Sequence, residues 1–326
     1  MRRKGSGDEA PEAGGETHGP SAGERQLSPT RRSMPSLSRM TARIDARIPW
    51  QSGTHERRVE NFYSRGADSF GDCHGGYLNF GLWEPGFTYL QAAENLVTHL
   101  GAWGGLDSAS RLLDVGCGFG AQDILLARKF GPALITGIDV TWPHVRAAQE
   151  RARVAGLSME VRIQHGSATE LSFPDASFSH VLSVEGVVHF NTREKFLQQA
   201  SRVLQPGGVL LLADYALARK PVQRLDKLFL KAACKGWQVP DENIDTLSSY
   251  QEKVERSGFT QVAVVSAGDR TIPQYFQEQT RREHFASMVR IRGPLAAAGG
   301  LAIDWFAWQA WKRGQLDYVL VRAVKR

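Results

Sequence analysis

Cysteine is scarce in this sequence, and its spacing suits neither disulfides nor metal. The 326 residues include only three cysteines, Cys73, Cys117 and Cys234, which lie far apart. This odd number excludes a closed disulfide framework, and no Cys-x-x-Cys pair is present. No acidic cluster has the spacing of metal ligands either, so we expect no metal at the site. The pattern favours a reducing compartment, and we expect a cytoplasmic protein.

Long hydrophobic runs are also missing. No stretch approaches the roughly 20 apolar residues that a membrane helix needs, so we expect no membrane insertion. The first twenty residues begin with basic side chains but lack the apolar core of a secretory signal. They also contain four acidic residues, which argues against an organelle transit peptide.

A concentrated basic surface is the third feature that the sequence lacks. The formal net charge is +6, from 40 Lys and Arg against 34 Asp and Glu. The basic residues are scattered, and no basic run alternates with aromatics as in nucleic-acid-binding strands. We therefore expect a small-molecule substrate and no nucleic acid, and we leave association into a homo-oligomer open.

The composition divides the chain into three parts. Residues 1–50 are rich in Gly, Ser, Pro, Arg and Glu, and we expect a disordered tail because they could bury little apolar surface. Residues 51–105 are expected to form an N-terminal helical lid, with a helix from residue 56, an aromatic glycine-rich loop and a helix over 88–101. Residues 106–326 are expected to form the main domain.

Strand and helix patterns alternate regularly in the main domain. Strands are predicted at 111–115, 133–139, 159–164, 178–184 and 209–214, with intervening helices at 121–130, 143–155 and 192–204. Such alternation predicts an α/β fold with a parallel sheet. Helical insertions are predicted at about 216–257 and 270–313, and further strands at 260–267 and 317–324.

The stretch "RLLDVGCGFGA" places Gly116, Gly118 and Gly120 between a predicted strand and a helix. Such a loop lies at the carboxyl edge of a parallel sheet, where a ligand can approach the backbone. Asp139 follows Gly120 by 19 residues, at a position where a carboxylate reaches ribose hydroxyls. The loop alone fits both a nicotinamide enzyme and a nucleoside-binding one. Asp114 favours the second, because a carboxylate there suits a cationic amino-acid group better than a pyrophosphate.

Several longer pieces resemble a known family. They are "NFGLWE", "LLDVGCGFG", "TGID", "FPDASFSHVLSVEGVVHF" and "ASRVLQPGGVLLLADY". Together they resemble the class I S-adenosylmethionine-dependent methyltransferases, within the small-molecule group that includes ubiquinone and tocopherol enzymes and natural-product sugar O-methyltransferases. The resemblance implies a Rossmann-like, mostly parallel seven-stranded sheet of order 3-2-1-4-5-7-6, with the helical insertions forming a lid. It also implies S-adenosyl-L-methionine as cofactor.

The resemblance also assigns cofactor contacts. The glycines of the loop and Asp114 would hold the methionine part, and Asp139, followed by Val140, would take the ribose. Ser167 and Ala168 would lie beside the adenine, although Ser167 stands where the family usually has Asp. Glu185 would border the cofactor. The remaining candidates are the aromatic residues before the sheet. Tyr63 is one of them, Tyr77 is expected to face the pocket, and Phe80 and Trp83 fit either pocket or core.

An alcohol acceptor must lose a proton, and histidine suits that task at neutral pH. His189 follows the fourth predicted strand, and Asp214 ends the fifth at the same sheet edge. By resemblance, His189 is the general base and Asp214 supports it. The predicted function is O-methylation of a small, largely apolar secondary metabolite. The alternatives are C-methylation of an isoprenoid, quinone or indole-type acceptor, an NAD(P)-dependent oxidoreductase, and a cofactor-binding protein without catalytic activity.

Overall fold

The computed structural model describes residues 54–64 and 74–326. The tail expected over residues 1–50 lies outside the described residues, as does Cys73. Helix α1 (Thr54–Ser64) begins the described chain, and α3 (Tyr89–Gly104) leads into the sheet. The capping box of Thr88 and Gln91 begins α3, and Gly105 ends it with a left-handed backbone.

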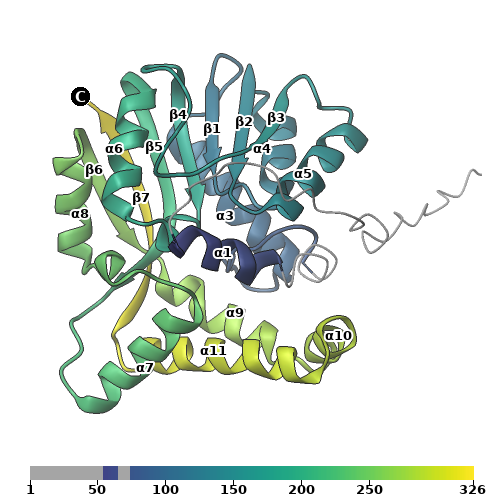
Figure 1. The fold of residues 1–326 in the computed structure, drawn as a ribbon, viewed down its shortest axis with the longest axis vertical. Helices are drawn as coiled ribbons and strands as arrows, with labels where there is room; N and C mark the ends of the chain where they lie inside the picture. Colours follow the sequence, from purple (N-terminus) through teal and green to yellow (C-terminus); the bar gives the residue numbers. More distant parts are fainter. Residues whose placement is uncertain (1–53, 65–73) are drawn as a thin grey trace, which may run out of the picture.

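The sheet has the predicted order. Its seven strands run β3-β2-β1-β4-β5-β7-β6, and the strands from β3 to β5 are parallel while β7 is antiparallel to both neighbours. This arrangement confirms the Rossmann-like fold (Figure 1). The bounds are β1 (Arg111–Val115), β2 (Leu134–Asp139), β3 (Val161–His165), β4 (Phe178–Val184), β5 (Leu204–Leu217), β6 (Phe259–Ser266) and β7 (Leu316–Lys325).

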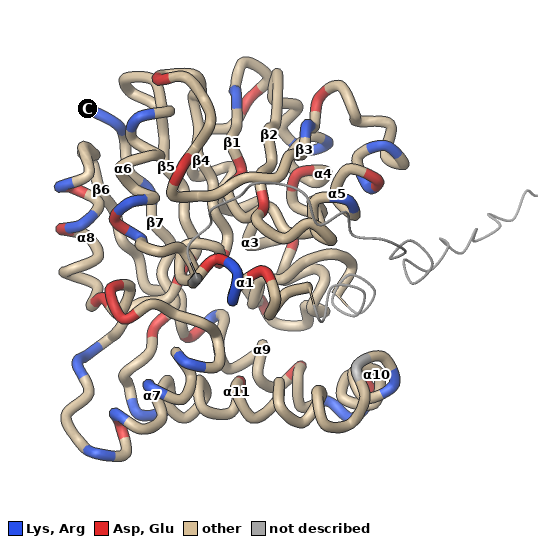
Figure 2. Tube along the Cα trace, viewed as in Figure 1, with Lys and Arg blue, Asp and Glu red and all other residues tan. Residues whose placement is uncertain are grey.

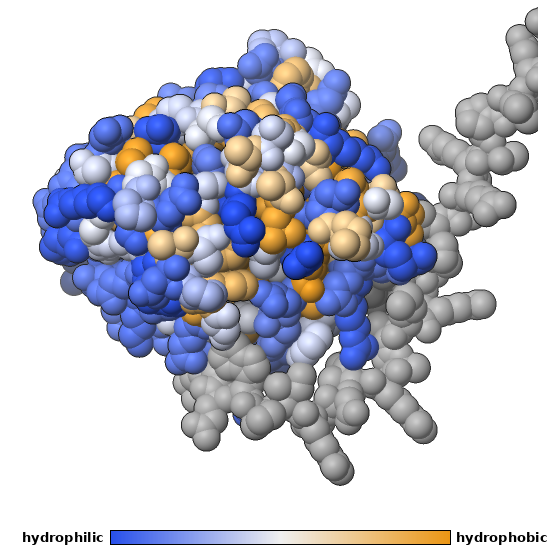
Figure 3. All heavy atoms as spheres, turned by 90° about the horizontal axis from the view of Figure 1, so that it is seen from above, coloured by the Kyte–Doolittle hydropathy of each residue, from blue (hydrophilic) through white to orange (hydrophobic). Residues whose placement is uncertain are grey.

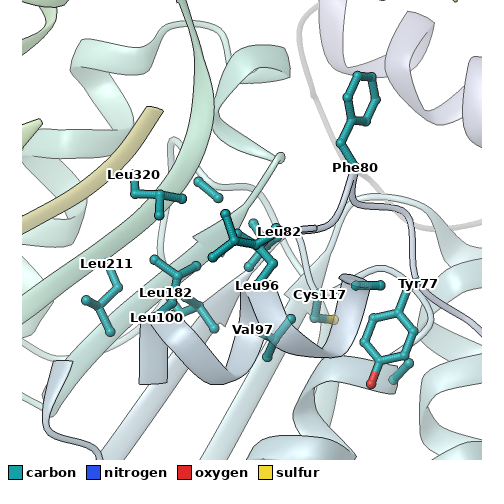
Figure 4. Close-up of a cluster of buried hydrophobic side chains, with 14 of the residues drawn as sticks. Tyr77, Phe80, Leu82, Leu96, Val97, Leu100, Cys117, Leu182, Leu211 and Leu320 are labelled. Carbon is teal, nitrogen blue, oxygen red and sulfur yellow. The ribbon is translucent and has the colours of Figure 1, made fainter. Parts of the chain in front are cut away.

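Helices cover both faces of the sheet. One face carries α3, α4 (Ala121–Phe130) and α5 (Trp142–Val154), and the other carries α6 (Arg193–Val203) and α8 (Leu247–Arg256). Figure 4 shows α3 side chains packed against strand residues, with Leu96 and Leu100 beside Leu182 and Leu211. Residues 51–105 are expected to form a lid. Within this segment, α3 instead belongs to the core of the sheet domain, because its apolar stripe is fully buried there.

A third group of helices lies beyond one end of the sheet. It consists of α7 (Arg224–Gly236), α9 (Ile272–Gln279), α10 (Arg282–Arg292) and α11 (Pro294–Lys312), and α1 lies between this group and the sheet (Figure 1). The rings of Phe276 and Trp308 stack with centroids 4.9 Å apart and join α9 to α11. We call these four helices the helical layer.

Two predicted elements differ from the observed ones. The helical insertion predicted at about 270–313 is divided into three helices, and the last break falls at Gly293, whose φ is +81°, followed by Pro294 at the helix start. Strand β5 also extends well beyond the predicted 209–214. Residues 205–208, with the sequence Gln-Pro-Gly-Gly, lie within it and accompany a register shift against β4.

Charge and hydropathy are mixed over the surface. Figure 2 shows Lys and Arg spread over the sheet helices and the helical layer, with acidic residues among them. The face in Figure 3 is largely hydrophilic, with small separate hydrophobic areas. Within residues 54–64 and 74–326, none of the helices combines the length and apolarity required to span a bilayer.

Candidate functional site

A cavity of about 490 Å³ lies between the carboxyl ends of the strands and the helical layer. Its walls come from α1, the loops after β1, β2, β3 and β4, and the inner sides of α9, α10 and α11. Its volume lies within the range of small-molecule sites, and its position is the one where open α/β sheets bind ligands. The parallel topology therefore brings most of the predicted site residues together.

Two of the three loop glycines line this cavity. Gly116 and Gly118 have φ values of +79° and +55°, and a Cβ at Gly118 would come within 3.2 Å of Leu78 Cδ1. Gly120 is not among the lining residues. A Cβ there would lie 2.8 Å from Ala148 Cβ, so this glycine allows α4 and α5 to approach each other. The expectation that Gly120 contacts a ligand is corrected to a packing role.

Asp139 lines the cavity at the end of β2, with Val140 beside it. Its carboxylate accepts hydrogen bonds from the N–H groups of Gly118, at 3.0 Å, and Thr141, at 2.7 Å. Burial acts to raise the pKa of Asp139, but His144 and these two donors outweigh it and lower the pKa overall. The glycine loop thus fixes an ionised carboxylate at the cavity wall.

Asp114 does not reach the cavity. Its side chain is fully buried under α4, where Oδ2 accepts a hydrogen bond from Gln122 Nε2 at 2.5 Å, and Gln122 is the residue that lines the wall. Burial, with a minor contribution from Asp139, raises the pKa of Asp114 to about 7. The expected direct contact of Asp114 with a ligand is corrected, because alternation along β1 turns this residue toward the helices.

Ser167 and Ala168 line the cavity beyond β3. The Ser167 hydroxyl donates to Glu56 Oε1 at 2.6 Å, and the Thr169 hydroxyl donates to the same oxygen at 3.2 Å. Glu56 belongs to α1, so these bonds hold the first turn of α1 over this end of the cavity. No local pattern predicts this contact, since it joins segments more than one hundred residues apart.

His189 lines the cavity on the short helical turn after β4. Its Nε2 is 2.8 Å from the hydroxyl oxygen of Tyr63, a second α1 residue on the cavity wall. Burial lowers the pKa of His189 to about 4, against the opposing effect of the Trp237 backbone. The imidazole is therefore neutral near pH 7, and Tyr63 donates to Nε2. Burial also raises the pKa of Tyr63 far above its usual value.

Asp214 does not support His189. Its Oδ2 instead accepts hydrogen bonds from the Arg193 guanidinium, at 2.9 Å and 3.1 Å, and from the Tyr250 hydroxyl at 2.8 Å. These groups lie on the α6 and α8 side of the sheet, and Asp214 has no exposed surface. The next residue, Tyr215, faces the cavity. Because successive residues of a strand point to opposite faces, the predicted role of Asp214 is corrected to a structural one.

Glu185 lines the cavity directly after β4, with a φ of +57° that few residues other than glycine adopt. Oε1 accepts hydrogen bonds from the Phe80 N–H at 2.6 Å and the Tyr318 hydroxyl at 2.7 Å. Oε2 accepts one from the Tyr215 hydroxyl at 2.7 Å. Burial raises the pKa of Glu185 to about 7, although these three donors act to lower it.

The aromatic candidates separate into wall and core. Phe80 lines the cavity, whereas Tyr77 and Trp83 pack in the core beside α3. Figure 4 shows Phe80 and Tyr77 pointing in different directions, so the expectation that Tyr77 faces the pocket is corrected. Trp237 and Tyr275 also line the cavity and were missed. They lie in the inserted segments, whose path over the site no local pattern indicates.

Comparison with known proteins gives a consistent result. Residues 113–212 match the methyltransferase domain family. The chain is 33% identical over 223 residues to erythromycin 3''-O-methyltransferase from Saccharopolyspora erythraea, covering 65% of this chain and 73% of that protein. It is 30% identical over 229 residues to 27-O-demethylrifamycin SV methyltransferase from Amycolatopsis mediterranei, covering 68% of this chain and 82% of that protein.

Solved structures share the architecture. The cyclase SpnF superposes with a TM-score of 0.69 at 24% identity, covering 83% of this chain and 96% of that one. Geranyl diphosphate C-methyltransferase from Streptomyces coelicolor superposes with a TM-score of 0.68 at 16% identity, covering 85% of this chain and 100% of that one. At these identities the likeness concerns the fold.

Proposed function

This chain belongs to the S-adenosylmethionine-dependent methyltransferases, and from that premise we propose that it methylates a hydroxyl group of a small, largely apolar natural product. The observation that carries the proposal is the pairing of a neutral, buried His189 with the Tyr63 hydroxyl at the cavity wall. Such a pair can accept a proton from an alcohol at neutral pH.

The side chains at one end of the cavity fit S-adenosylmethionine. Gly116 and Gly118 leave the backbone open where side chains would otherwise stand, and Asp139 presents an ionised carboxylate with lone pairs to spare for a ribose diol. Ser167 and Ala168 line the same end, where we place the adenine. Bound there, S-adenosylmethionine supplies an electrophilic methyl group on a positively charged sulfur.

The other end of the cavity fits an apolar acceptor. Its wall includes four large apolar side chains from α1 and the helical layer, which are Phe62, Phe285, Met288 and Leu301. These side chains would exclude water from the cavity, so that water does not compete with the acceptor hydroxyl for the methyl group. The names of the relatives from Saccharopolyspora and Amycolatopsis support a natural product as the acceptor.

The chain's own groups give a route for the acceptor proton. The acceptor hydroxyl would donate its proton to the Tyr63 oxygen while Tyr63 donates its own proton to His189 Nε2. Tyr63 need not be ionised in the resting protein, which agrees with its raised pKa. His189 returns to the neutral form readily, because burial disfavours its charged form.

Hydroxyl methylation is favoured over the alternatives by this pair. A carbon acceptor loses its proton only after the methyl group has arrived and makes no demand for a base beforehand. The relatives include 2-methyl-6-phytyl-1,4-hydroquinone methyltransferase from Synechocystis, 30% identical over 191 residues, so an electron-rich ring is the acceptor class to compare. Family membership leaves no support for an oxidoreductase.

The test compares His189→Asn with Asp214→Asn. The acceptor is identified by incubating the protein with deuterated-methyl cofactor and candidate natural products, with 27-O-demethylrifamycin SV among them, and analysing the products by mass spectrometry. We expect His189→Asn to reduce turnover by about a hundredfold or more while S-adenosylhomocysteine affinity, measured by calorimetry, is unchanged. Asp214→Asn should leave the turnover of the folded protein near normal.

Asp214→Asn should instead lower the free energy of unfolding, by about 1 to 3 kcal/mol, because Arg193 would lose one of its two buried carboxylate partners and keep the other, Asp245. Chemical denaturation measures this change. Unaltered turnover in His189→Asn would remove this residue from the reaction and leave a carbon acceptor as the better proposal.

A further inference from the structure

Glu185 brings a charge into the cavity that the described residues do not balance. All three of its hydrogen-bond partners are donors, two tyrosine hydroxyls and one backbone N–H, which is the environment of an ionised carboxylate. Within residues 54–64 and 74–326, Glu185 forms no ion pair. A carboxylate held in this way can bind a cationic group of a ligand.

Aromatic rings surround this carboxylate. Phe80 stacks on Tyr275 with centroids 3.8 Å apart, and Tyr215 and Trp237 lie 5.0 Å apart. The Phe80 ring is also 5.3 Å from Tyr215 and 5.9 Å from Trp237, so the four rings form one wall of the cavity. Aromatic faces attract cations, most strongly where water is excluded.

The order of the strands places this wall at the acceptor end. Asp139 and the glycine loop follow β2 and β1, whereas two of the Glu185 partners, Tyr215 and Tyr318, belong to β5 and β7 on the other side of β4. Tyr275 comes from the helical layer, and Trp237 directly follows its helix α7. The Glu185 carboxylate therefore faces away from the ribose site and toward the segments that enclose the acceptor.

We propose that the acceptor carries a protonated amine, and that Glu185 binds this cation against the wall formed by Phe80, Tyr215, Trp237 and Tyr275. This inference rests on the proposed function, because it assigns the substrate class of the same cavity. An amine at this wall fixes one end of the acceptor, and the hydroxyl to be methylated then lies toward His189. The pKa of Glu185, raised by burial to about 7, would fall when the cation binds.

The test uses choline and 3,3-dimethylbutan-1-ol, which have the same shape and differ by one positive charge. Their dissociation constants are measured by ligand-detected NMR, with and without saturating S-adenosylhomocysteine. We expect choline to bind about tenfold more tightly than the neutral alcohol, and this preference to persist with S-adenosylhomocysteine bound. Glu185→Gln should abolish the preference, because it removes the charge and keeps the side-chain size.

Two further variants control the result. Asp304→Asn removes another carboxylate of the same cavity and should leave the choline preference unchanged. Trp237→Leu retains Glu185 and should weaken the binding of choline more than the binding of the neutral alcohol. If Glu185→Gln does not fold, Trp237→Leu still tests the inference. An equal loss of affinity for both probes in Trp237→Leu would overturn it.

The outcomes separate the inference from the proposed function. Equal binding of the two probes to the native protein, or a preference that survives Glu185→Gln, overturns the amine site. A preference lost on adding S-adenosylhomocysteine, together with weaker S-adenosylhomocysteine binding to Glu185→Gln, assigns Glu185 to the cofactor and also overturns it. Failure of the native protein to bind S-adenosylhomocysteine counts against the proposed function, while the choline preference is still measured without it.

Discussion

Asp114 and Asp123 are two carboxyl groups buried together behind the glycine loop. Neither side chain is exposed, and they are close enough to share a hydrogen bond. Burial raises the pKa of both, and the charge of Asp114 raises the pKa of Asp123 further, whereas the hydrogen bond to Asp123 acts to lower the pKa of Asp114. The pair therefore keeps at least one proton at pH values where two exposed aspartates would both be ionised.

This pair predicts a loss of stability as pH rises. Since the folded-state pKa values lie above those of the unfolded chain, the folded protein binds more protons between about pH 4 and 7, and stability falls across that window. Asp123→Asn should flatten the dependence and raise the free energy of unfolding at pH 8 by about 1 to 3 kcal/mol. Urea denaturation at pH 5 and pH 8 measures both effects.

A matched control uses an exposed carboxylate. Asp107 has its pKa lowered by hydrogen bonds from Ser110 and Ala109, so it is ionised throughout this range. Asp107→Asn should leave the change between pH 5 and pH 8 as in the native protein. An equally steep decline in Asp123→Asn would contradict the assignment of the pH dependence to the buried pair.

At the scale of elements, Gly120 sets the distance between α4 and α5. Gly120→Ala places a methyl group 2.8 Å from Ala148 Cβ, in addition to forcing a left-handed backbone on alanine. Gly105 has nearly the same φ, +73° against +71°, and nothing within 4 Å of a Cβ. Comparing the two alanine variants separates the cost of packing from the cost of conformation.

We expect Gly105→Ala to lower the free energy of unfolding by about 1 kcal/mol. Gly120→Ala should lower it by about 1 to 3 kcal/mol more, because the added methyl group pushes α5 away from α4. The same displacement would move His144, which α5 holds beside Asp139. Denaturant titration gives both values, and S-adenosylhomocysteine calorimetry should show weaker binding only in Gly120→Ala. Equal losses in the two variants would mean that the helices can separate freely.

The elements of the sheet could be predicted because their patterns are local. The bounds of β1, β4 and α4 agree with the predictions to the residue, since apolar runs end at glycines or polar caps. The site could be predicted only in part. Gly116 and Asp139 lie at strand ends and His189 lies on the turn after β4, whereas Trp237 and Tyr275 reach the cavity through tertiary contacts that sequence spacing does not indicate.

At the scale of the whole molecule, α1 connects the two ends of the cavity. Glu56 in its first turn binds Ser167, and Tyr63 in its last turn binds His189. Val59, between these two residues, and His55, next to Glu56, are buried, so the helix depends on contacts with the cavity walls for its position. A ligand beneath α1 contacts the helix only when the helix is packed on the cavity, so binding stabilises this packed position.

Hydrogen exchange tests this connection. We expect saturation with S-adenosylhomocysteine to slow amide exchange in α1 by about tenfold, while α8, which packs on the distant face of the sheet, is unchanged. Ser167→Ala should reduce the added protection of α1, because Glu56 would lose one of the two hydroxyl groups that donate hydrogen bonds to it. Uniform slowing across α1 and α8 would instead indicate general stabilisation of the fold.

The alternation along β5 also bears on how this chemistry could change. Asp214 and Tyr215 are neighbours, yet one completes a buried ion pair and the other forms part of the ligand wall. Deleting or inserting one residue earlier in the strand would exchange the two sides. The phenol would then meet Arg193 and the carboxylate would enter the cavity, so a single-codon insertion or deletion could remove a stabilising contact and give the pocket a different reactive group.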